Sequence, residues 1–145
     1  MMKRLMGTSN DVSFTILRVV LGVVFFAHGA QKMLGWFGGF GFHATMGFLT
    51  HVGLPAPVAF LVIVIEFFGG LGLIFGLLSR IAALGIGVEM IGAIFTVHLP
   101  NGFFMNWMGT QKGEGFEYHL LAIAIAAVLL MRGAGAFAVD RAWTK

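Results

Sequence analysis

Four long apolar runs dominate the sequence of this 145-residue chain, and they occupy approximately residues 12–33, 58–78, 81–99 and 116–131. Each run is close to the length of about 17–25 residues with which an α-helix crosses a bilayer. The pattern predicts an all-α integral membrane protein, a four-helix bundle that forms one domain over residues 12–143. Ionisable side chains nevertheless lie within these runs or at their ends: Arg18, His28, Lys32, Glu66, Glu89, His98, Glu117 and His119. Because a charge in hydrocarbon is costly, such groups normally turn inward, pair with one another and mark a functional site.

Composition supports the membrane assignment. Hydrophobic residues make up 59% of the chain and charged residues 10%, whereas an average soluble domain has about 25% charged residues. The formal net charge of +3 comes from scattered residues rather than a basic stripe, so nucleic acid is not an expected partner. Cysteine is absent, which excludes disulfides, thiolate metal sites and thiol chemistry of the chain's own. A redox role would therefore use a bound molecule or a partner.

The distribution of lysine and arginine predicts the orientation. Seven of these residues fall on one side of the predicted spans and two, Lys32 and Lys112, on the other. Cytoplasmic loops carry the excess of positive charge in membrane proteins. Both termini are therefore expected in the cytoplasm. The seven residues are Lys3, Arg4, Arg18, Arg80, Arg132, Arg141 and Lys145.

The outer connections and the tail have their own signals. Residues 35–41 are glycine and aromatic residues suited to the membrane interface, and residues 42–52 are expected to form a short interfacial helix with Phe42, Met46 and Leu49 on one side. Residues 100–115 form the second outer loop, and residues 137–143 are expected to lie along the cytoplasmic surface. The spacing Gly72-xxx-Gly76 favours close helix packing.

The polar residues fall at one depth. His28, Gln31 and Lys32 share one side of the first helix at spacings i, i+3 and i+4, and Glu66 lies near the middle of the second. With the predicted orientation, every polar residue of the spans except Arg18 lies between the bilayer centre and the outer face. This convergence predicts a polar pocket in the outer half. Arg18, near the cytoplasmic boundary, is expected to extend its side chain toward water.

Helix geometry separates two pairs of candidates. Glu89 and His98 are nine residues apart, about half a turn out of phase, so they face one pocket only if the helix is distorted before Pro100. Glu117 and His119 also diverge, so at most one of them points inward. Simpler readings stay open as well: Glu66 and Lys32 pair only to hold two helices together, Glu89 belongs to a structural pair, and His28 is a hydrogen-bonded core residue.

The chain resembles the DoxX family of small four-helix bacterial membrane proteins, from about residue 12 to residue 143. The resemblance rests on segments that occur in this order: Arg18, HGAQK at 28–32, GWFGG at 35–39, EFFGG at 66–70, GLLSR at 76–80, VHLPNGFF at 97–104, EGFEY at 114–118 and VDR at 139–141. Val139 stands where such proteins often have a serine.

The resemblance implies a quinone-linked redox subunit or a quinone-stress protein of the bacterial cytoplasmic membrane, because the family is associated with quinol oxidase and thiosulfate:quinone oxidoreductase. It also implies a membrane or periplasmic redox partner. A homo-oligomer is a separate candidate assembly. Quinone is the candidate cofactor, haem is a weaker one, no metal site is expected, and the catalytic residues are not identified. The site residues carried over are His28, Lys32, Glu66, His98, Glu117 and Tyr118, with Gln31, Glu89 and His119 as secondary candidates.

Two alternative functions remain open at this point. In the first, the protein does no redox chemistry but serves in binding or in complex assembly, and the same pocket holds a lipid or another small apolar molecule. A haem or metal site built from His28, His98 and His119 is the weaker alternative, because no two of these histidines share a helix at ligand spacing.

Overall fold

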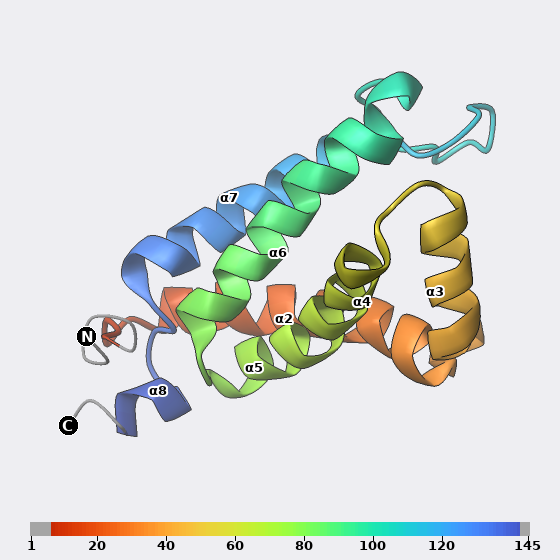
Figure 1. The fold of residues 1–145 in the computed structure, drawn as a ribbon. Coiled ribbons are helices and arrows are strands. Elements are labelled where there is room, and N and C mark those ends of the chain that lie inside the picture. Colours follow the sequence, from red (N-terminus) through yellow and green to blue (C-terminus); the bar gives the residue numbers. More distant parts are fainter. Residues whose placement is uncertain (1–6, 143–145) are drawn as a thin grey trace.

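The computed structural model describes residues 7–142, and all regular secondary structure within them is helical. Four helical rods follow one another along the chain (Figure 1). Two of them change helix type along their length, and shorter helices lie in the first outer connection and in the tail. The rods are α2 (Val12–Leu34); α4 (Ala56–Val64) with the π-helix η2 (Ile65–Gly69) and α5 (Gly70–Phe75); α6 (Ser79–Ala93) with the π-helix η3 (Ile94–His98) and the 3-10 helix η4 (Leu99–Asn101); and α7 (Glu117–Arg132). The shorter helices are η1 (Trp36–Gly38), α3 (Gly41–His51) and α8 (Val139–Ala142).

Three of the rods are long and apolar enough to cross a membrane. They are Val12–Leu34, Ala56–Phe75 and Ser79–Asn101, with mean hydropathies of 1.8, 2.5 and 1.8. The fourth rod, α7, has 16 residues. At a rise of 1.5 Å per residue it is about 24 Å long, less than the hydrocarbon thickness of about 30 Å. The all-helical fold and three spans are therefore confirmed, while the fourth span and the cytoplasmic orientation of both termini stay predictions.

The two described ends of the chain meet at one end of the bundle (Figure 1). Ser9 N donates to the carbonyl of Arg132 at 3.4 Å, and Thr8 Oγ1 donates to the carbonyl of Gly135 at 3.1 Å. The positively charged residues Lys3, Arg4 and Lys145, which contributed to the orientation argument, lie outside the described residues. At the opposite end, the predicted interfacial helix is present as α3, and its Phe42 ring meets Phe60 edge-on at 6.2 Å.

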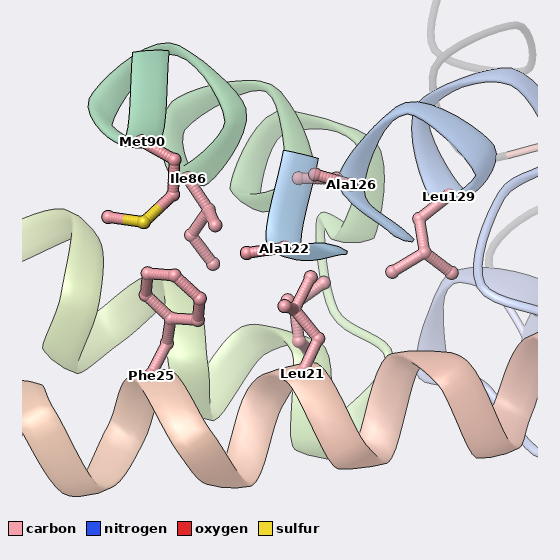
Figure 2. Packing of buried hydrophobic residues seen from close by; sticks show 9 residues of the cluster. Leu21, Phe25, Ile86, Met90, Ala122, Ala126 and Leu129 are labelled. Carbon is pink, nitrogen blue, oxygen red and sulfur yellow. The ribbon is translucent and has the colours of Figure 1, made fainter. Parts of the chain in front are cut away.

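The core lies where α2, α5, α6 and α7 face one another. Figure 2 shows Phe25 and Leu21 of α2 pointing toward Ile86 of α6 and the small residues of α7. Leu73 of α5 belongs to the same cluster and is 0% exposed. Apolar burial at this meeting point holds the two halves of the bundle together.

Glycines allow α2 to approach the second rod closely. A Cβ atom on Gly29 would lie 2.3 Å from Phe67 N, and one on Gly70 would lie 2.4 Å from Phe26 N. No side chain fits at either position, so the backbones are in direct contact. Gly76 of the predicted GxxxG pair has a different role: it ends α5 with a φ of +72°, a conformation that glycine adopts at little cost.

The expectation for Arg18 is wrong. Its side chain is 2% exposed, and its guanidinium donates to four backbone carbonyls, those of Leu73 (2.5 Å), Ile74 (2.7 Å), Ala134 (2.9 Å) and Phe137 (3.4 Å). Carbonyls in the last turn of a helix lack helical donors. Arg18 satisfies those of α5 and ties them to the tail, so it has no reason to extend toward water.

The tail is also more than a surface segment. The buried Asp140 accepts hydrogen bonds from Leu78 N (2.7 Å) and Ser79 N (2.9 Å), so it caps the start of α6 from 61 residues away. A second cap is local: Ser13 N donates to Asp11 at the start of α2 and lowers the pKa of that carboxyl below its ordinary value of 3.8. Trp143, the last residue of the predicted surface tail, lies outside the described residues.

Candidate functional site

An ion pair connects the first two rods. Lys32 Nζ lies 2.5 Å from Glu66 Oε2, and the two side chains are 26% and 7% exposed. This confirms the predicted pairing of Glu66 with Lys32. The contact of α2 with the second rod at Gly29 and Gly70 brings the two side chains within reach. Glu66 itself lies in the π-helical segment η2, and π-helical turns within α-helices often occur at functional sites.

A second carboxyl joins this pair from the third rod. The Glu89 side chain of α6 interacts electrostatically with the Glu66 carboxyl, and its own Oε2 is buried without a hydrogen-bond partner. The arrangement therefore brings two carboxyl groups and the Lys32 amine together between three rods.

The fourth rod contributes Tyr118, a residue in the first turn of α7. Its half-buried ring packs against the core cluster, and its phenol interacts electrostatically with both Glu66 and Glu89. Lys32, Glu66, Glu89 and Tyr118, which we call the Glu66 cluster, thus come from all four rods. Sequence reasoning gave Glu89 only a secondary place, and the signal that pointed to it was its position near the middle of a span.

Two candidates from α2 lie beside this cluster rather than within it. His28 interacts electrostatically with Lys32 and Glu66, but it is exposed on the surface of α2. Gln31 Nε2 donates to the Phe37 carbonyl at 3.2 Å and so supports the turn at η1. Although these residues were predicted to share one side of the helix, His28 lies next to the cluster, whereas Gln31 bonds the first outer connection.

The histidines of α7 and the end of the third rod form a separate contact. The rings of His98 and His119 lie 4.0 Å apart between centroids, and His98 Nδ1 lies 2.9 Å from the Glu114 carbonyl oxygen. His119 is 5% exposed, and its Nδ1 has no partner. The helix is distorted before Pro100, as the sequence allowed, because η3 and η4 replace the α-helix there. Even so, Glu89 and His98 contact different groups.

Glu117 bonds the second outer loop. Its Oε1 accepts hydrogen bonds from Met105 N (2.9 Å) and Trp107 Nε1 (3.3 Å), so it holds the second outer loop. His119 of the same helix is buried. The two side chains therefore diverge as predicted, and His119 is the one that points inward.

An outer-half pocket stays a prediction. Two grooves in the described part of the chain, of about 490 and 150 Å³, are lined by apolar residues and glycines and by none of the predicted site residues. Among the described residues, no group of three or more His, Asp or Glu side chains is arranged to hold a metal. His98 and His119 meet, while His28 lies on α2 beside Lys32 and Glu66.

Comparisons with known proteins place the chain among membrane proteins. Residues 13–99 match the family model described as DoxX. The chain is 36% identical over 124 residues to "Putative oxidoreductase CatD" of Bacillus subtilis (strain 168), covering 86% of this chain and 83% of that one. It is 29% identical over 136 residues to "Inner membrane protein YqjF" of Escherichia coli (strain K12), covering 94% and 95%. No solved structure matches the chain.

Proposed function

The chain belongs to the DoxX family of membrane proteins, and from that premise we propose that it binds a quinone or quinol head group at the Glu66 cluster in a redox reaction at the inner membrane. The observation that carries the proposal is the convergence of Lys32, Glu66 and Glu89 from three membrane-spanning rods. Charged and protonated groups are costly within a span and are retained there mainly for function. The relative named as an oxidoreductase supports a redox role.

The chemistry of the cluster suits a quinone. Reduction of a quinone to a quinol takes up two electrons and two protons, and the ring oxygens need hydrogen-bond donors throughout. The Lys32 ammonium and the Tyr118 hydroxyl are such donors. The Glu66 and Glu89 carboxyls are groups that can exchange protons with the ring oxygens. The electrons come from a second redox protein at the membrane, since the chain has no cysteine to supply them.

A thermal-shift experiment tests this function. A ligand that binds only the folded protein stabilises it by RT ln(1 + [L]/Kd), about 2.7 kcal/mol at 100 times Kd. A short-chain quinone should raise the melting temperature of the purified parent protein. Glu66→Gln and Tyr118→Phe should each remove the shift and leave the protein folded, whereas His51→Ala, which changes an exposed histidine of α3, should retain it. Absence of a shift in the parent, or an equal shift in both site variants, would exclude a quinone site here.

One alternative has an observation of its own. The Lys32–Glu66 pair already neutralises both charges, so the cluster would hold two helices together in a binding or assembly protein that does no redox chemistry. Absorbance of the bound quinone separates the two functions. A quinone that binds but is never reduced, even with a membrane fraction and an electron donor supplied, favours the assembly protein.

A further inference from the structure

An apolar groove of about 490 Å³ runs between the second rod and α6. Its walls include Phe68 and Phe75, which are 58% and 62% exposed, and its floor includes Gly69, Gly72 and Gly85. No charged or polar side chain lines it. A groove of this size falls within the range of about 300–1,000 Å³ that is common for ligand sites. Its lining can recognise only hydrocarbon.

The groove reaches the level of the Glu66–Glu89 carboxyl pair. On the second rod, its lining includes Val64 and Ile65, which immediately precede Glu66. On α6, Gly85 lines the groove and precedes Glu89 by four residues, so it lies on the same side of this helix as the Glu89 carboxyl. The two rods are in contact at this level, since a Cβ atom on Gly85 would lie 3.2 Å from the Ile65 side chain. The upper end of the groove therefore lies at the level of the cluster, one helical turn from Glu89 on α6.

From this end the groove runs toward the end of the bundle where the described termini meet. Its lining continues from Ile65 and Phe68 of η2 along α5 to Leu78, which precedes α6. The distance along the second rod from Val64 to Phe75 is about 16 Å at 1.5 Å per residue. A polar group at one end and a long apolar channel leading away from it together suit an amphiphile that has a ring head and a chain.

We propose that this groove binds the isoprenoid tail of the quinone whose head group occupies the Glu66 cluster, an inference that rests on the proposed function. Continuity with the carboxyl pair selects this occupant. A phospholipid keeps its polar head at the membrane interface, so its acyl chain would enter from the far end and leave the carboxyls unused. A helix of a second copy would cover the groove without placing a ring at Glu66.

The test compares quinones with the same head group and with no tail, one isoprene unit or several units. Gly69→Leu fills the upper groove, because a Cβ there makes only ordinary contacts, the nearest at 3.8 Å from Ala82. Gly92→Leu is the matched control, since a Cβ on Gly92 meets nothing within 4 Å. Affinity is measured in detergent by equilibrium titration. Each ligand is compared between parent and variant, so that its partitioning into micelles cancels.

Gly69→Leu should weaken binding of the several-unit quinone by at least about tenfold and binding of the tailless quinone by less than about twofold. Gly92→Leu should change neither. Phe75→Ala, at the far end, should weaken the several-unit quinone but not the one-unit quinone, which gives a measure of how far the tail extends. If the parent and Gly69→Leu bind the several-unit quinone equally well, the tail site is wrong. Binding of the tailless quinone in the same experiment would still support the head-group site.

Failure of the proposed function has a different signature. If no quinone binds the parent at any tail length, both proposals fail together. If, in addition, mass spectrometry of the purified protein finds a phospholipid that Gly69→Leu removes, the groove is a lipid site and the tail proposal is wrong.

Discussion

Replacing Glu66 by alanine should lower the free energy of unfolding by about 2–3 kcal/mol. Breaking a fully buried ion pair by removing one partner costs about 3–5 kcal/mol, because the other charge is left uncompensated. Here Glu66 is 7% exposed but Lys32 is 26% exposed. The freed ammonium can therefore reach water or lipid head groups along its flexible stem, which reduces the penalty.

The assay is thermal unfolding in detergent, followed by the fluorescence of the three tryptophans. The expected decrease in melting temperature for Glu66→Ala is on the order of 5–10 °C. Glu66→Gln should lose less, because its amide still hydrogen-bonds its neighbours. Adding Lys32→Met to Glu66→Ala should recover part of the loss, since no charge is then left unpaired.

Lys112→Met is the control, because it removes an exposed lysine of the second outer loop and should leave the melting temperature unchanged. If Glu66→Ala melts within about 1 °C of the parent protein, the ion pair does not stabilise the bundle. Lys32 and Glu66 would then not be a structural link between the first two rods.

Three further results are expected. A C-terminal tag should be inaccessible from outside intact cells. A cysteine introduced within residues 100–115, which would be the chain's single cysteine, should react with an impermeant reagent. If the tag is accessible from outside, the orientation is the reverse of the predicted one. Arg18→Lys should destabilise the protein by at least about 3 kcal/mol in thermal unfolding, because an ammonium cannot reach four carbonyls on two segments; a change below about 1 kcal/mol would contradict the role of Arg18 as a link. Gly29→Ala should cost more than about 2 kcal/mol, because its Cβ would overlap Phe67 N, whereas Gly92→Ala should be neutral or slightly stabilising; equal melting temperatures would contradict the close contact of the two rods.

The sequence by itself determined the helical rods and their approximate bounds. The predicted runs at 12–33, 58–78 and 81–99 correspond to spans at Val12–Leu34, Ala56–Phe75 and Ser79–Asn101, and the interfacial helix was anticipated at 42–52. These features follow from local hydropathy, because a lipid-exposed backbone must satisfy its own hydrogen bonds within each helix. The pairing of Lys32 with Glu66 was also predictable, since ionisable groups within membrane spans normally pair with one another.

Only the tertiary structure decided which polar groups share a site. Glu89 and His98 lie on the same rod, yet Glu89 joins Glu66 and His98 contacts His119. Helical periodicity separated Glu89 from His98, but it describes one helix at a time and carries no information on which side chains of other rods each residue will meet.

The role of Arg18 also depended on tertiary structure. Its acceptors at Ala134 and Phe137 are more than 110 residues away along the chain. No local pattern indicates which distant carbonyls will need a donor, so sequence reasoning assigned the guanidinium to water. Helix ends create unsatisfied carbonyls wherever the fold places them, and only the folded chain brings Arg18 to these four.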